Sequence, residues 1–197
     1  MNLNGAQQQF ARRLPLKVFL LALLLASNPG FAQVQQHVLN DEMDSALSMW
    51  TDALTPADTP CKTKLVKAPP KLLRPVIASY RTSCSVHRSK GSFERERSIT
   101  VMLHQVTWKD LPISKYFYSQ GYDSATDIMM GNERKITIDV PFAEARKTIE
   151  SWWTERQLEV VSDAPGISAS AGDSGDESLA PDEHDARKSI FTHSFSE

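Results

Sequence analysis

His87 and His104 are the residues of this chain best placed for acid–base chemistry, because both fall in one predicted hairpin. They lie on the same outward face, about five residue pairs apart. At ~3.3 Å per residue they are more than ~15 Å apart, too far for a general acid–base pair. We therefore interpret them as solvated histidines or as partners of residues across the strands, with His87 facing Glu94.

The sequence contains no motif of a catalytic, metal or cofactor site. It lacks C-x-x-C, H-E-x-x-H and the acidic spacing of a calcium loop. Glycine-rich phosphate loops and the G-x-S-x-G turn are missing as well. We assign no catalytic residue, no metal ligand and no cofactor. We favour a non-catalytic protein, with an enzyme of unrecognised site as the alternative.

The first 32 residues have the order of a secretory signal. Three basic residues precede the apolar run 18–26, and small residues precede a cleavage site after Ala32. Nine apolar residues span roughly 14 Å as a helix, well short of the ~30 Å hydrocarbon core. We expect a cleaved signal peptide and a mature chain that is periplasmic or secreted, with no stable membrane anchor.

The two cysteines, Cys61 and Cys84, both lie in the predicted mature chain. Two thiols in an exported protein favour a disulfide, here closing a loop of about 23 residues. The alternative is two separate buried thiols. The run 61–66 alternates like a strand and places Cys61 inward, in phase with Cys84 on the hairpin, which supports the bridge.

Two helices are predicted, one at each end of the strand-rich region. The first, about 39–54, has an apolar stripe at helical spacing, with Asn40 as N-cap and Pro56 beyond its end. The second, about 141–157, begins at Pro141. Its apolar positions recur at the same spacing: Phe142, Ala145, Ile149 and Trp152.

A hairpin over about 76–107 is predicted between the helices. With the turn centred on Lys90-Gly91, paired residue numbers sum to 181, so Tyr80 faces Val101 and Thr82 faces Ile99. Further strands are expected at 61–66, 135–140 and 158–161. The segment 127–132 is either a strand with a turn or a short helix. The fold predicted is α+β, a small antiparallel sheet of three to five strands packed on helices.

The predicted domain organisation is a signal at 1–32, one α+β domain at 33–161 and a tail at 162–197. The tail is acidic and consists mostly of Ser, Asp, Gly, Ala, Glu and Pro. It has too few apolar residues to offset its ordering entropy, so we expect disorder. Residues 189–195 alternate more clearly and could dock as an edge strand.

Charge is segregated along the chain. Residues 33–60 carry five acids and no base, whereas residues 61–97 carry ten bases and two acids. This basic segment predicts a partner or polyanion surface. Its candidate residues are Arg81, Arg88, Lys90, Arg95 and Arg97. One alternative is internal neutralisation by the acidic first helix and tail. Another is an acidic tail that shields the segment until a partner displaces it.

The aromatic run 116–122 lies in a segment without strong periodicity. We interpret it as a recognition loop presenting Tyr116, Tyr118 and Tyr122, because tyrosines in loops make adaptable contact surfaces. The alternative is that these rings fold onto the core.

These observations together predict an exported, non-catalytic protein-binding module. Two roles fit equally: an inhibitor or immunity protein against a periplasmic toxin or hydrolase, and an accessory component of an envelope or secretion assembly. The expected partner is another envelope or secreted protein, and no nucleic acid is expected. The alternatives are a periplasmic hydrolase, and polyanion or membrane-surface binding through residues 61–97.

Overall fold

The computed structural model describes residues 36–170, 172 and 175–195. The predicted signal segment and its cleavage site lie outside the described residues. The helices are α2 (Asp41–Asp52), η1 (Lys71–Leu73) and α3 (Phe142–Glu155), and the strands are β1 (His37–Val38), β2 (Ile77–Ser89), β3 (Ser92–Trp108), β4 (Leu111–Asp123), β5 (Ile128–Ile138), β6 (Val160–Asp163), β7 (Gly166–Ser170), β8 (Asp176–Pro181) and β9 (Ser189–Phe195).

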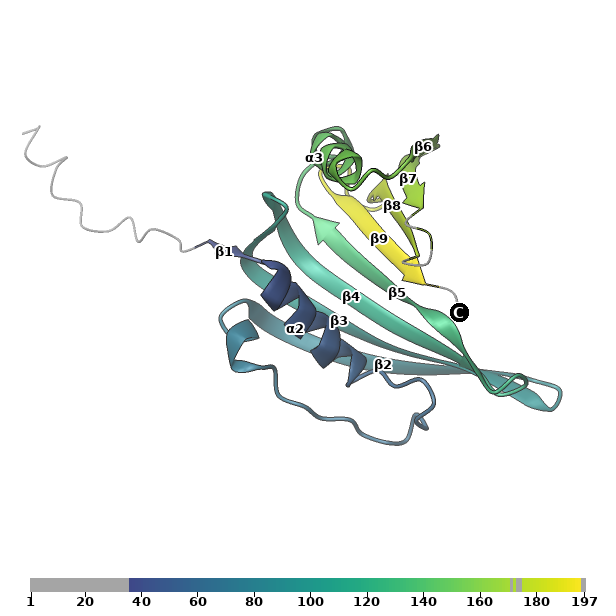
Figure 1. Ribbon diagram of the computed structural model, residues 1–197. Coiled ribbons are helices and arrows are strands. Elements are labelled where there is room, and N and C mark those ends of the chain that lie inside the picture. The colour runs from purple at the N-terminus through teal and green to yellow at the C-terminus, as the bar shows by residue number, and fades with distance from the viewer. Residues whose placement is uncertain (1–35, 171, 173–174, 196–197) are drawn as a thin grey trace, which may run out of the picture. The chain divides into compact units, whose positions relative to one another are not determined.

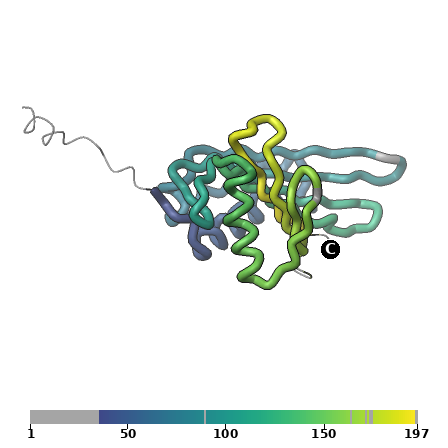
Figure 2. Tube along the Cα trace, turned by 90° about the horizontal axis from the view of Figure 1, so that it is seen from above, coloured from purple at the N-terminus to yellow at the C-terminus, as the bar shows by residue number. Residues whose placement is uncertain are grey.

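These strands form one nine-stranded sheet, so the predicted small sheet of three to five strands is wrong. The order is β1-β3-β4-β5-β9-β8-β7-β6, and β2 also pairs with β3. Every pairing is antiparallel except that of β1 with β3. The β2–β3 and β4–β5 hairpins project at the same end of the sheet (Figures 1 and 2).

Both α2 and α3 lie on one face of the sheet. Asp44 of α2 binds Arg134 of β5, and Trp153 of α3 binds Glu177 of β8. Arg134 and Glu177 are both register partners of His193 on β9, so their side chains share a face. Figure 1 shows α2 in front of β3 and β4. We call this side the helix face and the other side the open face.

The two predicted helices are confirmed, each slightly shorter than expected. Asn40 caps α2 by accepting a hydrogen bond from the Met43 backbone N–H at 2.9 Å. The inward stripe of α2 is buried, with Leu47 and Trp50 each 1 % exposed. Amphipathic spacing and capping are local signals, which is why the sequence was enough to locate these helices.

The predicted hairpin register is confirmed over most of its length. Tyr80 pairs with Val101, Thr82 with Ile99, and the chain turns through Lys90 and Gly91. Gly91 has φ +84°, a left-handed conformation that glycine adopts without steric cost. The register shifts by one residue near Ala78, so Ile77 rather than Ala78 pairs with Leu103.

The predicted disordered tail is wrong. It supplies β7, β8 and β9, and β9 lies inside the sheet between β5 and β8 rather than at an edge. Ile167, Leu179 and Phe191 are at most 2 % exposed. Because these three residues occupy inward positions of successive strands, a segment with few apolar residues can still form a half-buried part of the sheet.

Three further assignments are settled by the backbone. Residues 61–66 form a loop and not a strand. Residues 128–132 belong to β5, which decides for the strand alternative. The predicted strands at 135–140 and 158–161 correspond to parts of β5 and β6.

The Cys61–Cys84 disulfide is confirmed, with a Cα–Cα distance of 5.6 Å. It joins the 61–66 loop to β2. A disulfide indicates an oxidising compartment outside the cytoplasm. Among the described residues, no helix combines the length and apolar character needed to cross a membrane.

Candidate functional site

Strand β2 is a long edge strand whose outer side is free within the described part of the chain. Its thirteen residues pair with β3 alone, and β1 meets β3 only beyond the start of β2, at Val106 and Thr107. Nearly every side chain from position 78 to 88 is exposed. Proteins usually protect such an edge, because its unpaired N–H and C=O groups can pair with another chain.

The outward-pointing backbone groups of β2 follow from the neighbouring pairing. Phe93 on β3 receives a hydrogen bond from the Ser124 N–H at 2.9 Å and donates its own N–H to the Ser124 hydroxyl at 2.6 Å. Its backbone is therefore directed away from β2. Arg88, its register partner, must likewise direct its backbone outward. Every second residue back along β2 does the same: Val86, Cys84, Thr82 and Tyr80.

A groove runs beside this edge on the helix face. It has a volume of about 400 Å³ and lies between β2 and the 61–66 loop. Tyr80, Thr82 and Cys84 line it from the strand, and Lys62 and Lys64 line it from the loop. The disulfide fixes one end of the loop against the strand. Figure 1 shows this loop running alongside β2.

The exposed bases of residues 61–97 form no ion pair with any described carboxylate. Two of the acids expected to neutralise them are paired elsewhere: Asp44 of α2 with Arg134, and Glu177 of β8 with Arg156. The described ion pairs thus give no support to internal neutralisation or to a shielding tail. Exposed bases of this segment are Lys62, Lys64, Lys67, Lys71, Arg74, Arg81, Arg88 and Lys90.

The five candidate residues of the basic surface do not lie together. Arg81 is on the open face of β2, Arg88 is on the other face, and Lys90 is in the hairpin turn. Arg95 and Arg97 are 8 % and 4 % exposed. They cannot contribute to an open surface.

The two buried arginines instead hold the loop over the sheet. Arg97 donates to the carbonyls of Thr59, Pro60 and Thr63 at 2.6–3.2 Å. Arg95 donates to those of Ala57 and Asp58 at 2.8 and 2.6 Å. Their role in the structure is to satisfy the backbone of a segment without regular structure.

The aromatic run lies in strand β4, not in a loop. Tyr116 is fully buried and Tyr118 is 6 % exposed, whereas Tyr122 stays partly exposed near the hairpin end. Tyr118 donates to Asp52 of α2 at 3.1 Å. Burial raises the pKa of both the Tyr116 and the Tyr118 phenol. These two residues fix the sheet beneath α2 and cannot form a recognition surface.

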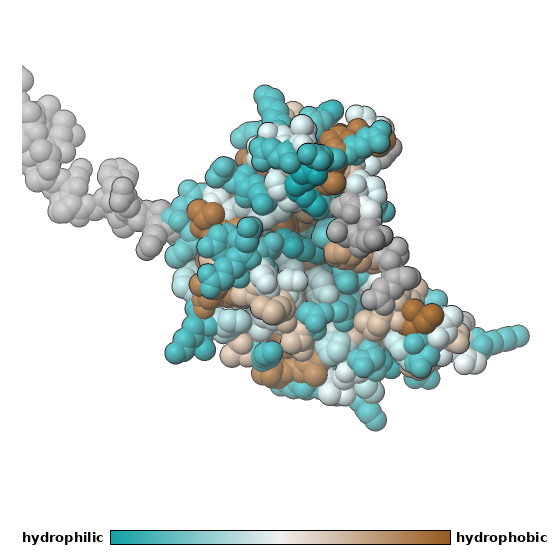
Figure 3. Space-filling view, viewed as in Figure 1, coloured by the Kyte–Doolittle hydropathy of each residue, from teal (hydrophilic) through white to brown (hydrophobic). Residues whose placement is uncertain are grey.

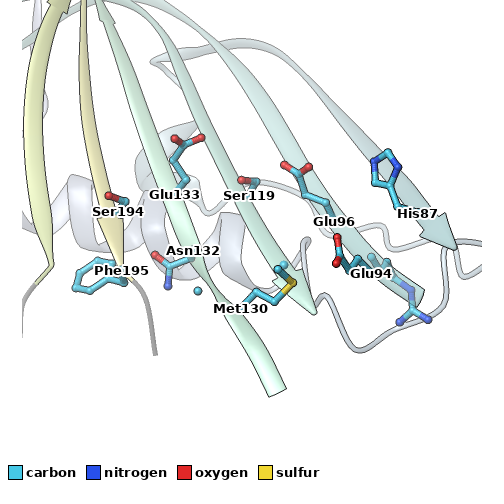
Figure 4. Close-up of a pocket in the computed structure, with 12 residues that line it drawn as sticks. His87, Glu94, Glu96, Ser119, Met130, Asn132, Glu133, Ser194 and Phe195 are labelled. Atoms are coloured by element: carbon cyan, nitrogen blue, oxygen red, sulfur yellow. The ribbon is translucent and has the colours of Figure 1, made fainter. Parts of the chain in front are cut away.

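The open face carries an acidic hollow of about 350 Å³ at the hairpin end. Gly121 and Gly131 face each other across β4 and β5, and the Met130 side chain lies against Gly121. Figure 4 shows Ser194, Glu133, Ser119 and Glu96 side by side, each from a different strand. If the protein were an enzyme, as the alternative prediction has it, this hollow is the place where catalytic side chains would have to lie.

The hollow contains His87 at its margin, but no acid–base pair. His87 faces Glu94 in the register, as expected. Among the described residues, no hydrogen bond or ion pair joins the His87 ring to Glu94 or Glu96. Glu133 is paired with Lys135 at 2.8 Å. In the part of the chain that the structure describes, no three His, Cys, Asp or Glu side chains lie close enough together to hold a metal ion.

Comparisons with protein-family models, curated proteins and solved structures found no match to this chain. The candidate site therefore depends on geometry and charge alone.

Lys62 and Lys64 line the groove and belong to the basic segment, although they are not among the five predicted surface residues. Arg95 and Arg97 alternate in phase with Ile99 and Val101, so the strand pattern alone puts them on the inward face. The sequence could therefore have excluded both arginines from an exposed basic surface. The position of the loop beside β2 depends on long-range contacts and left no signal in the sequence.

Proposed function

We propose that this protein is an exported binding module that captures an extended segment of another protein along the free edge of β2. The observation that carries the proposal is the thirteen-residue edge strand, whose outer side has no strand partner among the described residues, and the groove beside it, whose lysines form no ion pair with them. Strand addition uses these features: main-chain hydrogen bonds give affinity, and pockets for alternate side chains give specificity.

The groove defines the chemistry of the captured segment. Side chains on one side of an added strand would enter the groove, where Lys62 and Lys64 favour acidic groups and Tyr80 and Val66 offer apolar contact. Val66 is 72 % exposed and Tyr80 is 38 % exposed. Seen from the helix face, the surface is largely hydrophilic with small separate hydrophobic patches (Figure 3). This face therefore favours capture of a strand over binding through a broad apolar interface.

The proposed location is the periplasm or the medium outside the cell, which the disulfide and the signal-like first 32 residues support. The proposed partner is an envelope or secreted protein with an acidic, extended segment. A captured strand serves either role that the sequence allows. An inhibitor or immunity protein would sequester such a segment, and an assembly component would use it as an attachment point.

Site-specific photo-cross-linking in the envelope of the expressing cell tests this proposal. A photoreactive phenylalanine analogue in place of Thr82 should cross-link one partner protein, whereas the analogue in place of Met102, which is exposed on the open face, should not. Partner capture should be lost in Thr82→Pro, because proline removes an outward N–H without breaking the β2–β3 ladder.

The matched control is Ser162→Pro on β6, at the other edge of the sheet, where the same register argument gives an outward N–H. This variant should capture the partner normally. Cross-linking from position 102 but not 82 would overturn the proposal. Retention on heparin that survives Thr82→Pro and disappears in high salt would instead favour polyanion binding.

A further inference from the structure

A second cavity, of about 210 Å³, lies between α2 and α3 on the helix face, away from the β2 edge. Its floor is the cross-strand row Arg134, His193 and Glu177 of β5, β9 and β8. The first turn of α2 supplies one wall, and α3 with the β3–β4 turn supplies the other. Figure 1 shows both helices on this side of the sheet.

The charges of this interhelical cavity are divided between its two walls. Asp41 and Asp44 come from α2, whereas Lys109 and Arg156 come from the opposite wall. The Lys109 ammonium and the Arg156 guanidinium lie 4.7 and 4.5 Å from the centre of the same Trp152 ring. One wall is therefore acidic and the other is basic.

Two ion pairs hold the floor, and three of their four side chains stay partly exposed to the cavity side or solvent. Asp44 binds Arg134 at 2.7 Å, and Glu177, whose side chain is 4 % exposed, binds Arg156 at 2.7 Å. The Nε of Arg134 is buried and has no hydrogen-bond partner among the described residues. A cavity lined by aromatic rings with a few convergent charged groups is typical of a ligand site.

Two charged groups at this site remain without ion pairs among the described residues, Asp41 on the acidic wall and Lys109 on the basic wall. Asp41 is accompanied on its wall by Asp44, and Lys109 is accompanied on its wall by Arg156. Asp44 and Arg156 already form ion pairs with Arg134 and Glu177. The wall groups can therefore accept an ammonium on one side and a carboxylate on the other.

Asp44 binds Arg134 and Arg156 binds Glu177, so the acidic wall is anchored on β5 and the basic wall on β8, two strands or about 10 Å apart. This separation is of the same order as the ~7 Å span of an extended dipeptide. The cavity volume corresponds to about seven water molecules, the size of a dipeptide with small side chains. Trp108 and Phe191 provide apolar contact between the two ends.

We infer that the interhelical cavity binds a short zwitterionic peptide, with its ammonium at Asp41 and Asp44 and its carboxylate at Lys109 and Arg156. This is a second site, separate from the strand-capturing edge.

Calorimetric titration of the full mature chain tests the inference, with alanyl-alanine as probe. N-acetyl-alanyl-alanine lacks the ammonium and alanyl-alanine amide lacks the carboxylate. Each capped form should bind roughly tenfold or more weakly than the free dipeptide, because a charge-assisted contact is lost. No binding of alanyl-alanine at millimolar concentration, or equal binding of all three probes, would overturn the inference.

Two pairs of variants locate the site. Lys109→Asn should weaken dipeptide binding roughly tenfold, and asparagine suits the φ of +50° at this position. Asp110→Asn, in the same turn with φ +61°, is the matched control because Asp110 does not line the cavity. Asp41→Asn should weaken binding, and Glu42→Gln in the same helical turn should not. Unchanged binding in both Lys109→Asn and Asp41→Asn would place the dipeptide elsewhere.

Discussion

At the residue scale, Arg97 shows how a charged side chain can serve structure in a segment that composition marks as a basic surface. Its guanidinium is 4 % exposed and binds three loop carbonyls. Guanidinium suits this task because it presents several N–H donors in a rigid plane. The groove beside β2 exists because the loop is held there.

Replacing Arg97 by leucine should lower the free energy of unfolding by about 2–4 kcal/mol. Three hydrogen bonds from a charged donor are lost, and the three carbonyls lose their partner. Denaturant unfolding measures this change. The control is Arg81→Leu, an exposed site on the neighbouring strand, expected within about 0.5 kcal/mol of the unaltered chain. Equal effects of the two substitutions would show that the Arg97 contacts do not hold the loop.

At the scale of elements, the sequence predicted what is locally encoded. The α2 stripe, its Asn40 cap and the β2–β3 register all depend on spacing within one element or across one tight turn. The 61–66 alternation was misleading, because Cys61 and the lysines belong to a loop whose place is set by the disulfide and the two buried arginines. Strand-like periodicity in a short run does not establish a strand when its partners are far away in sequence.

The candidate site was predicted in part. The basic segment and the edge-forming hairpin could be predicted from sequence, whereas the groove could not. Its lysines become neighbours of Tyr80 and Thr82 only through the loop's long-range contacts. Tyr116 and Tyr118 were misplaced for a similar reason, since β4 is recognisable as a strand only once β3 and β5 pair with it on both sides.

At the scale of the whole described unit, the C-terminal strands complete the core rather than extend from it. Phe191 of β9 packs with Trp108 and Trp152 at ring-centroid distances of 4.9 and 6.0 Å. Leu179 and Ile167 continue the same buried row through β8 and β7. Removing these strands would expose the edge of β5 and much of the surface beneath α3.

A chain ending at residue 159 should therefore lose cooperative folding, because the apolar surface buried by β7–β9 is no longer available. Circular dichroism at increasing temperature should show no sharp transition for this variant, whereas a chain ending at residue 195 should keep one. A truncated chain that unfolds cooperatively, near the temperature of the full chain, would show that the C-terminal strands are an appendage.

The central claim is that the β2 edge captures a strand. Its most direct test is residue-resolved amide hydrogen exchange of the unaltered chain, with and without the partner that cross-linking identifies. In the free protein, the amides of Thr82, Cys84 and Val86 should exchange rapidly, whereas those of Arg81, Ser83 and Ser85 should be protected by the β3 ladder. Partner binding should slow exchange at the first three positions and leave the second three unchanged. Continued rapid exchange at Thr82, Cys84 and Val86 in the saturated complex would contradict the account.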